Sequence, residues 1–133
     1  MVGGKSDVPE AEIVLKNITS EKNVTNLVQK TSIDQLKALI SELDFFLSVD
    51  TGPIYIAEAF NVPTIDIIRP IDEKEQPPIS EKNLIVLPAN REKPEMFVMN
   101  ARSYNPKEAK RQVNSITVQM VLDACKELIS KLK

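Results

Sequence analysis

The sequence contains no histidine and no tryptophan, and Cys125 is the only cysteine among its 133 residues. Without histidine, Ser-His-Asp and Cys-His catalysis are excluded, together with most zinc sites. A single cysteine cannot form an internal disulfide, so a reducing compartment such as the cytoplasm is expected. Any acid or base that this chain supplies must therefore be a carboxylate, a lysine, a tyrosine or Cys125.

Other scarce features narrow the class of protein further. Only 5% of the residues are aromatic, so Ile, Val and Leu must fill the core, for which a hydrophobic fraction of 42% is sufficient. The net charge of −2 argues against nucleic acid as a partner. No apolar run approaches the ~18 residues of a membrane span, and the N-terminus lacks the apolar region of a signal peptide. The length suits a single domain, residues 1–133.

Helix and strand patterns alternate along the chain. Short connections between them favour parallel pairing, with helices covering the faces of the sheet. We therefore predict an α/β fold, a Rossmann-like parallel sheet with flanking helices, in which strands near 45–49, 64–68 and 84–87 lie side by side. The predicted helices cover 8–20, 31–43, 53–60 and 115–133, the predicted strands cover 23–29, 44–50, 63–70 and 83–88, and 89–115 is mostly irregular.

The first residues look like the end of a strand followed by a plain turn at Gly3 and Gly4. A doubly wound domain normally begins with one or two central strands, and here the fold is predicted to lack its first strands. A truncated chain would give this pattern, and so would an unusual small fold. If strands are missing, the open sheet edge favours a homo-oligomer or a partner that carries the missing half.

The stretch DTGP, residues 50–53, stands where an apolar strand meets a helix. Ligands of open α/β sheets bind beyond the carboxyl ends of the strands. There Asp50 can accept hydrogen bonds from sugar hydroxyls, and free N–H groups of Thr51, Gly52 and Ile54 can bind phosphate oxygens. These residues predict a site for a phosphorylated, hydroxyl-rich ligand. Taken alone, they fit an ordinary helix N-cap and turn as well.

The longer stretch SVDTGPIYIAEAFNVPTIDIIRPIDE resembles glycosyltransferase family 9, the ADP-heptose:lipopolysaccharide heptosyltransferase family, whose pattern reads SVDTGPxHxAAAxxxPTxxxFGPTDP. Residues 23–50 and 113–128 are similar to the stretches before and after that pattern in the family. The resemblance implies a metal-independent transferase of GT-B fold without a cofactor, of which this chain would be the C-terminal, donor-binding half.

The same resemblance implies the partners of the whole enzyme. It would transfer a heptose from an ADP-heptose-like nucleotide sugar to a lipopolysaccharide-type acceptor. That acceptor places it in the cytoplasm, at the cytoplasmic face of the inner membrane, with peripheral membrane association. The family's catalytic base and much of its acceptor surface belong to the N-terminal half. This chain is therefore assigned no catalytic residue and is not expected to act alone.

The resemblance also assigns the donor-binding residues. Asp50, Thr51 and Gly52 match the family's donor-contacting motif. Asp7 falls where the family has an acidic residue near the nucleotide ribose, with Glu10 as the alternative.

Two positions depart from the family pattern. Tyr55 stands at the family's histidine, where it is predicted to contact the donor, and Arg69 replaces a glycine. Tyr55 can donate a hydrogen bond but is not cationic near neutral pH. Both changes favour a second hypothesis, a non-catalytic ligand-binding or interaction domain that kept the fold and lost the reaction.

Three other features are assigned ordinary structural roles. Asp44 and Asp50 flank one strand and lie at its opposite ends, so they are no acid–base pair. The basic residues between 91 and 111 are predicted to form a solvated loop, because acidic residues interrupt them. Cys125, on an amphipathic helix, is predicted to be a buried structural thiol.

Overall fold

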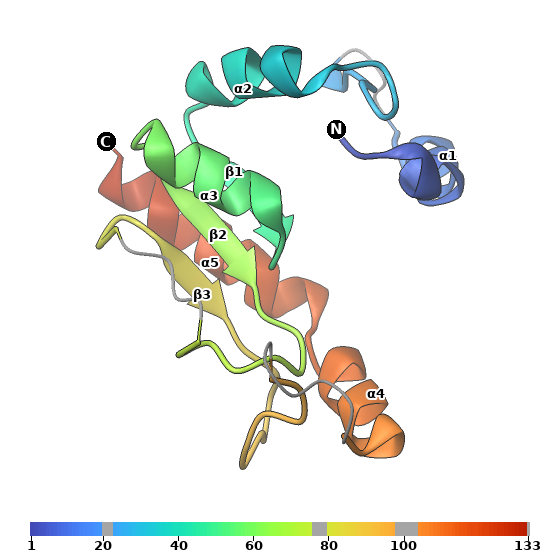
Figure 1. Cartoon of the computed structure of the whole chain (residues 1–133), viewed down its shortest axis with the longest axis vertical. Helices are drawn as coiled ribbons and strands as arrows, with labels where there is room; N and C mark the ends of the chain where they lie inside the picture. Colours follow the sequence, from blue (N-terminus) through green and yellow to red (C-terminus); the bar gives the residue numbers. More distant parts are fainter. Residues whose placement is uncertain (20–22, 76–79, 98–103, 133) are drawn as a thin grey trace. The chain divides into compact units, whose positions relative to one another are not determined.

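A computed structural model describes residues 1–19, 23–75, 80–97 and 104–132 (Figure 1). The chain divides into two compact units, unit 1 (Met1–Leu39) and unit 2 (Ile40–Lys133), each considered by itself below. The elements in chain order are the 3-10 helix η1 (Lys5–Asp7), α1 (Val8–Asn17), α2 (Ile33–Ser41), β1 (Phe46–Val49), α3 (Gly52–Ala59), β2 (Thr64–Ile67), β3 (Leu84–Val86), α4 (Pro106–Asn114) and α5 (Val118–Lys131).

Unit 1 begins with a turn that the Asp7 carboxylate closes. The Gly4 N–H donates to Asp7 Oδ2 at 2.7 Å, and the Asp7 N–H donates to the Gly4 carbonyl at 3.2 Å. A Cβ at Gly3 would lie 2.7 Å from the same carboxylate oxygen, so the glycine leaves room for this bond. The plain turn predicted at the two glycines is confirmed.

The strand predicted at residues 23–29 is wrong, because none of these residues is a strand residue in the structure. The segment does pair briefly with the N-terminus. The Leu27 N–H donates to the Met1 carbonyl and the Gln29 N–H to the Gly3 carbonyl, both at 2.9 Å. Gln29 then adopts a left-handed conformation with φ of 60°, which turns the chain away and ends the pairing.

The core of unit 2 is a parallel three-stranded sheet in the order β1-β2-β3. Phe46 is paired with Thr64, and Ile65 with Leu84. The predicted parallel neighbours are thus confirmed, and with them the α/β class. Helices α3 and α5 lie on opposite faces of this sheet (Figure 1). Side chains that alternate along a strand therefore face different helices.

The face of the sheet toward α5 carries an apolar core. Ile65, Val86 and Leu128 are buried there, and Cys125 packs against them while remaining partly exposed. Its packing agrees with a structural thiol, but the prediction that Cys125 is buried is wrong, because the side chain is only partly buried. Helix α5 contacts β2 and β3, so Leu47 on β1 remains 41% exposed. The apolar sequence of β1 is therefore not fully buried on this face of the sheet.

The stretch predicted as irregular contains helix α4. Its N-cap, Asn105, accepts hydrogen bonds from the N–H groups of Lys107 (3.1 Å) and Glu108 (3.2 Å), and Pro106 occupies the first turn. An Asn-Pro pair is a standard helix start, so the sequence did contain the signal. Residues 98–103 of the stretch lie outside the described residues.

In the described part of the chain, no helix is both long enough and apolar enough to cross a bilayer. The C-terminal helix illustrates why. It has 14 residues, Val118–Lys131, and its N-cap is Thr117, whose hydroxyl accepts from the Met120 N–H at 3.2 Å, whereas the sequence predicted a start near Ser115.

Candidate functional site

The turn from β1 into α3 places Asp50, Thr51 and Gly52 at the carboxyl edge of the sheet. Thr51 is the N-cap residue of α3, but its side chain does not cap the helix. Its hydroxyl instead donates to the Val49 carbonyl at 3.0 Å and lies 3.2 Å from Ser48 Oγ. The structure therefore does not support an ordinary side-chain N-cap at Thr51.

The backbone donors at this helix start are fewer than predicted. The Ile54 N–H donates to the Thr51 carbonyl at 3.0 Å, so it is not free for a ligand. Pro53 has no N–H, which leaves those of Thr51 and Gly52. Gly52 is exposed, and a Cβ built on it would meet no atom within 4 Å. The space in front of Gly52 is therefore open to a ligand.

Tyr55 lies on the first turns of α3 and is 36% exposed. Burial raises the pKa of its phenol, and the negative charges of Asp50, Asp66 and Glu58 raise it further. The side chain is therefore a neutral hydroxyl at physiological pH. It stands among carboxylates, whereas a histidine at this position could become cationic.

Asp66, the third residue of β2, was not among the predicted site residues. Its side chain is only 1% exposed, and its Oδ1 atom has no hydrogen-bond partner among the described residues. Burial raises the pKa of Asp66 to about 7, with the charges of Asp50 and then Glu58 adding to the rise. An acidic residue in the middle of the apolar strand TIDI was the available signal.

A polar network fastens α3 to the start of β2. Glu58 of α3 accepts from Asn83 Nδ2 at 2.6 Å and from the Ser80 N–H at 3.4 Å. Asn83 Oδ1 in turn accepts from the buried Thr64 N–H at 2.9 Å. The Asn83 side chain thus extends the hydrogen bonding between β2 and β3 by one residue and holds Glu58 in place.

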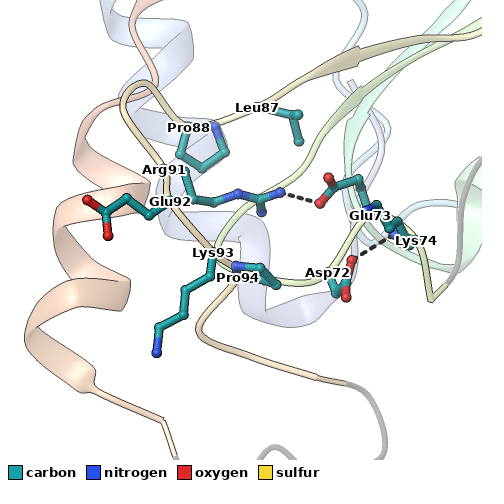
Figure 2. Close-up of a pocket in the computed structure, with 9 residues that line it drawn as sticks. All are labelled: Asp72, Glu73, Lys74, Leu87, Pro88, Arg91, Glu92, Lys93 and Pro94. Carbon is teal, nitrogen blue, oxygen red and sulfur yellow. Dashed lines mark hydrogen bonds and ion pairs between the residues drawn. The ribbon is translucent and has the colours of Figure 1, made fainter.

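A pocket of about 260 Å³ lies beyond the carboxyl ends of β2 and β3. Figure 2 shows Arg91 reaching across it toward Glu73, while the amino group of Lys93 points away. Arg91 forms an ion pair with Glu73 and donates to the Ile71 carbonyl at 2.9 Å. Its side chain is 7% exposed, so the prediction of a solvated loop is wrong for this arginine. Asp72 also lines the pocket.

Asp7 belongs to unit 1, and the structure assigns it a local role. Besides the Gly4 N–H, its carboxylate accepts from Ser6 Oγ at 3.3 Å. It precedes α1 as predicted, although its side chain does not cap that helix. Its contact with a nucleotide ribose stays a prediction, as does the alternative at Glu10.

Comparisons of the sequence and of the structure with known proteins all point to one family. The family model described as glycosyltransferase family 9 (heptosyltransferase) matches residues 1–105. The chain is 26% identical to lipooligosaccharide heptosyltransferase 2 of Haemophilus influenzae, an alignment that covers 98% of this chain and 37% of that protein. It is also 46% identical over 43 residues to the lipopolysaccharide core heptosyltransferase OpsX of the same organism, which covers 32% of this chain and 12% of the relative.

Two solved structures share the fold. One is the E. coli ADP-heptose LPS heptosyltransferase II, with a TM-score of 0.71 and 22% identity. The other is a family 9 glycosyltransferase from Veillonella parvula DSM 2008, with a TM-score of 0.73 and 14% identity. Each match covers 98% of this chain and 35% or 36% of the other, so the chain spans about a third of these proteins. The extent of the family match shows that the chain belongs to glycosyltransferase family 9, the heptosyltransferase family.

Proposed function

We propose that this chain, residues 1–133, is the donor-binding part of a family 9 glycosyltransferase. The N–H groups of Thr51 and Gly52 would hold the diphosphate of a nucleotide sugar, and Asp50 would accept hydrogen bonds from its hydroxyls. The observation that supports this most is that the N-terminus of α3, directly after Asp50, is unobstructed at Gly52. The Thr51 hydroxyl turns back to the strand, and the space before Gly52 is empty.

The identity of the donor and acceptor follows from the relatives. One of the solved structures is named an ADP-heptose LPS heptosyltransferase. By analogy we propose an ADP-heptose-like donor and a lipopolysaccharide-type acceptor, with the acceptor-binding half supplied by another part of the enzyme or by a partner. Such an enzyme would work at the cytoplasmic face of the inner membrane. Tyr55 would contact the donor as a neutral hydrogen-bond donor.

A second candidate function is a ligand-binding domain that lost the reaction. Tyr55 favours it. A histidine at this position could bring a positive charge to a diphosphate, whereas Tyr55 is a neutral phenol among carboxylates. Binding alone does not separate this candidate from the first. Sugar transfer by the complex with an acceptor-binding half would do so, and its absence there would favour the second.

Replacing Asp50 with alanine should weaken the binding of ADP-glucose, used as a stable ADP-sugar, by about tenfold or more. The reason is the loss of charge-assisted hydrogen bonds to the ligand hydroxyls, each worth roughly 1.5–3 kcal/mol. Isothermal titration measures the change. Asp44→Ala is the matched control, because Asp44 is exposed and precedes the same strand at its other end. Equal affinities for the two variants, or no binding by the wild type, would remove the proposed donor site.

A further inference from the structure

The face of β2 toward α3 carries two buried polar side chains, Thr64 and Asp66. Thr64 Oγ1 and Asp66 Oδ1 are both buried and have no hydrogen bond among the described residues. Register partners in a sheet point to the same side, and Asp66 is paired with Ser48. The Ser48 hydroxyl lies 3.2 Å from the Thr51 hydroxyl. Asp66 therefore stands one strand away from the proposed donor site.

The groups that face Asp66 are two carboxylates and the neutral phenol of Tyr55. Asp50 follows β1, and Tyr55 and Glu58 come from α3; all three interact electrostatically with Asp66. On its other side β3 contributes Ile85, which has no charge. Helix α5 packs on the opposite face of the sheet through Leu128.

Within the described ranges, no three His, Cys, Asp or Glu side chains are arranged to hold a metal ion. Glu58 is already engaged by Asn83 and by the Ser80 N–H. A proton on Asp66 would lower the negative charge of this cluster, and a buried carboxyl group whose Oδ1 has no partner among the described residues binds a proton readily.

We propose that Asp66 links ligand binding to pH: the site at Asp50, Thr51 and Gly52 binds an anionic ligand more tightly when Asp66 is protonated. This inference rests on the proposed function and adds a regulatory group to the same site. An ionised Asp66 places a second negative charge next to Asp50 and repels a diphosphate. The protonated form removes that charge without changing the shape of the site. The raised pKa of Asp66, about 7, puts the transition within the physiological range.

Titration with ADP-glucose at pH 6 and pH 8 tests the linkage. Each phosphate of this ligand carries one ester bond and shares the anhydride bond. Neither phosphate therefore has a group that titrates between pH 6 and pH 8, and the charge of the ligand stays constant. We expect the wild-type affinity to be roughly fivefold weaker at pH 8, because Asp66 is mostly protonated at pH 6 and mostly ionised at pH 8, where its charge repels the diphosphate. For Asp66→Asn the change should stay below about twofold, since the amide cannot ionise. Asp44→Asn, which alters an exposed acid at the other end of β1, should behave like the wild type.

The outcomes separate the two proposals. Equal wild-type affinities at pH 6 and pH 8, or the same fall in Asp66→Asn, would overturn the linkage while leaving the donor site intact. Absence of binding by the wild type at both values would remove the donor site and the linkage with it. A carbon-13 NMR titration of the Asp66 carboxyl group in the free protein gives an independent check. A midpoint near 7 is expected, and a midpoint near 4 would overturn the role of Asp66.

Discussion

Replacing Asp66 with asparagine is expected to make the protein more stable than the wild type at pH 8, and to leave its stability near pH 4 almost unchanged. In the folded state the pKa of Asp66 is about 7, whereas an aspartate in an unfolded chain has a pKa of about 3.9. The folded protein therefore holds this proton over a pH range in which the unfolded chain has released it. The stabilisation that this gives is fully present below about pH 4 and is lost as the pH rises through 7.

The loss should be on the order of 3–4 kcal/mol, because the two pKa values differ by about three units and each unit corresponds to about 1.4 kcal/mol. Urea unfolding followed by circular dichroism at pH 4 and pH 8 measures it. The difference in free energy of unfolding between the two pH values should be smaller in Asp66→Asn by that amount. Asp44→Asn should leave it as in the wild type. Equal pH dependence in all three proteins would mean that Asp66 titrates normally.

Replacing Arg91 with alanine should destabilise unit 2 by about 2–3 kcal/mol. The substitution leaves Glu73 without its partner and removes the hydrogen bond to the Ile71 carbonyl. Breaking a buried ion pair from one side typically costs about 3–5 kcal/mol, and the partial exposure of Glu73 reduces the expected value. Urea unfolding at neutral pH measures the change. Arg91→Lys should recover only part of the loss, because lysine cannot bond to two groups in the fork geometry.

Lys93→Ala is the matched control for this experiment. Lys93 is on the same loop and lines the same pocket, but it is exposed and points away from Arg91 (Figure 2). Its substitution should change the free energy of unfolding by less than about 0.5 kcal/mol. If Arg91→Ala were as mild as this control, the ion pair across the pocket would not hold the loops together.

The sheet could be predicted from the sequence because its strands are short apolar runs separated by helices, and such runs have few other ways to bury their side chains. The segment at 23–29 failed by the same criterion. It has the composition of a strand, but a strand also needs a partner along its length. Two backbone hydrogen bonds join this segment to the N-terminus, and the left-handed conformation of Gln29 ends the pairing. Helix α4 was missed because its residues are mainly polar. The Asn105 cap was a better guide than hydrophobic periodicity there.

The candidate site was predictable in part for a different reason. The Asp-Thr-Gly-Pro stretch is continuous in sequence, so its position at the end of β1 followed from the strand prediction alone. Asp66 contributes to the same region from the next strand, and the register that places it beside Ser48 is not visible in the sequence. The ion pair of Arg91 with Glu73 joins residues 18 positions apart, and only the folded loops bring them together.

Backbone amide shifts in a nitrogen-15 NMR spectrum, recorded while ADP-glucose is added at pH 6, test the proposed donor site most directly. If their N–H groups hold the diphosphate, the signals of Thr51 and Gly52 should move the most. The signal of Ile54 should move less, because its N–H is already bonded to the Thr51 carbonyl, and that of Asp44 should stay unchanged. Saturable shifts elsewhere in unit 2, with Thr51 and Gly52 unmoved, would contradict the assignment of this helix start as the nucleotide-sugar site.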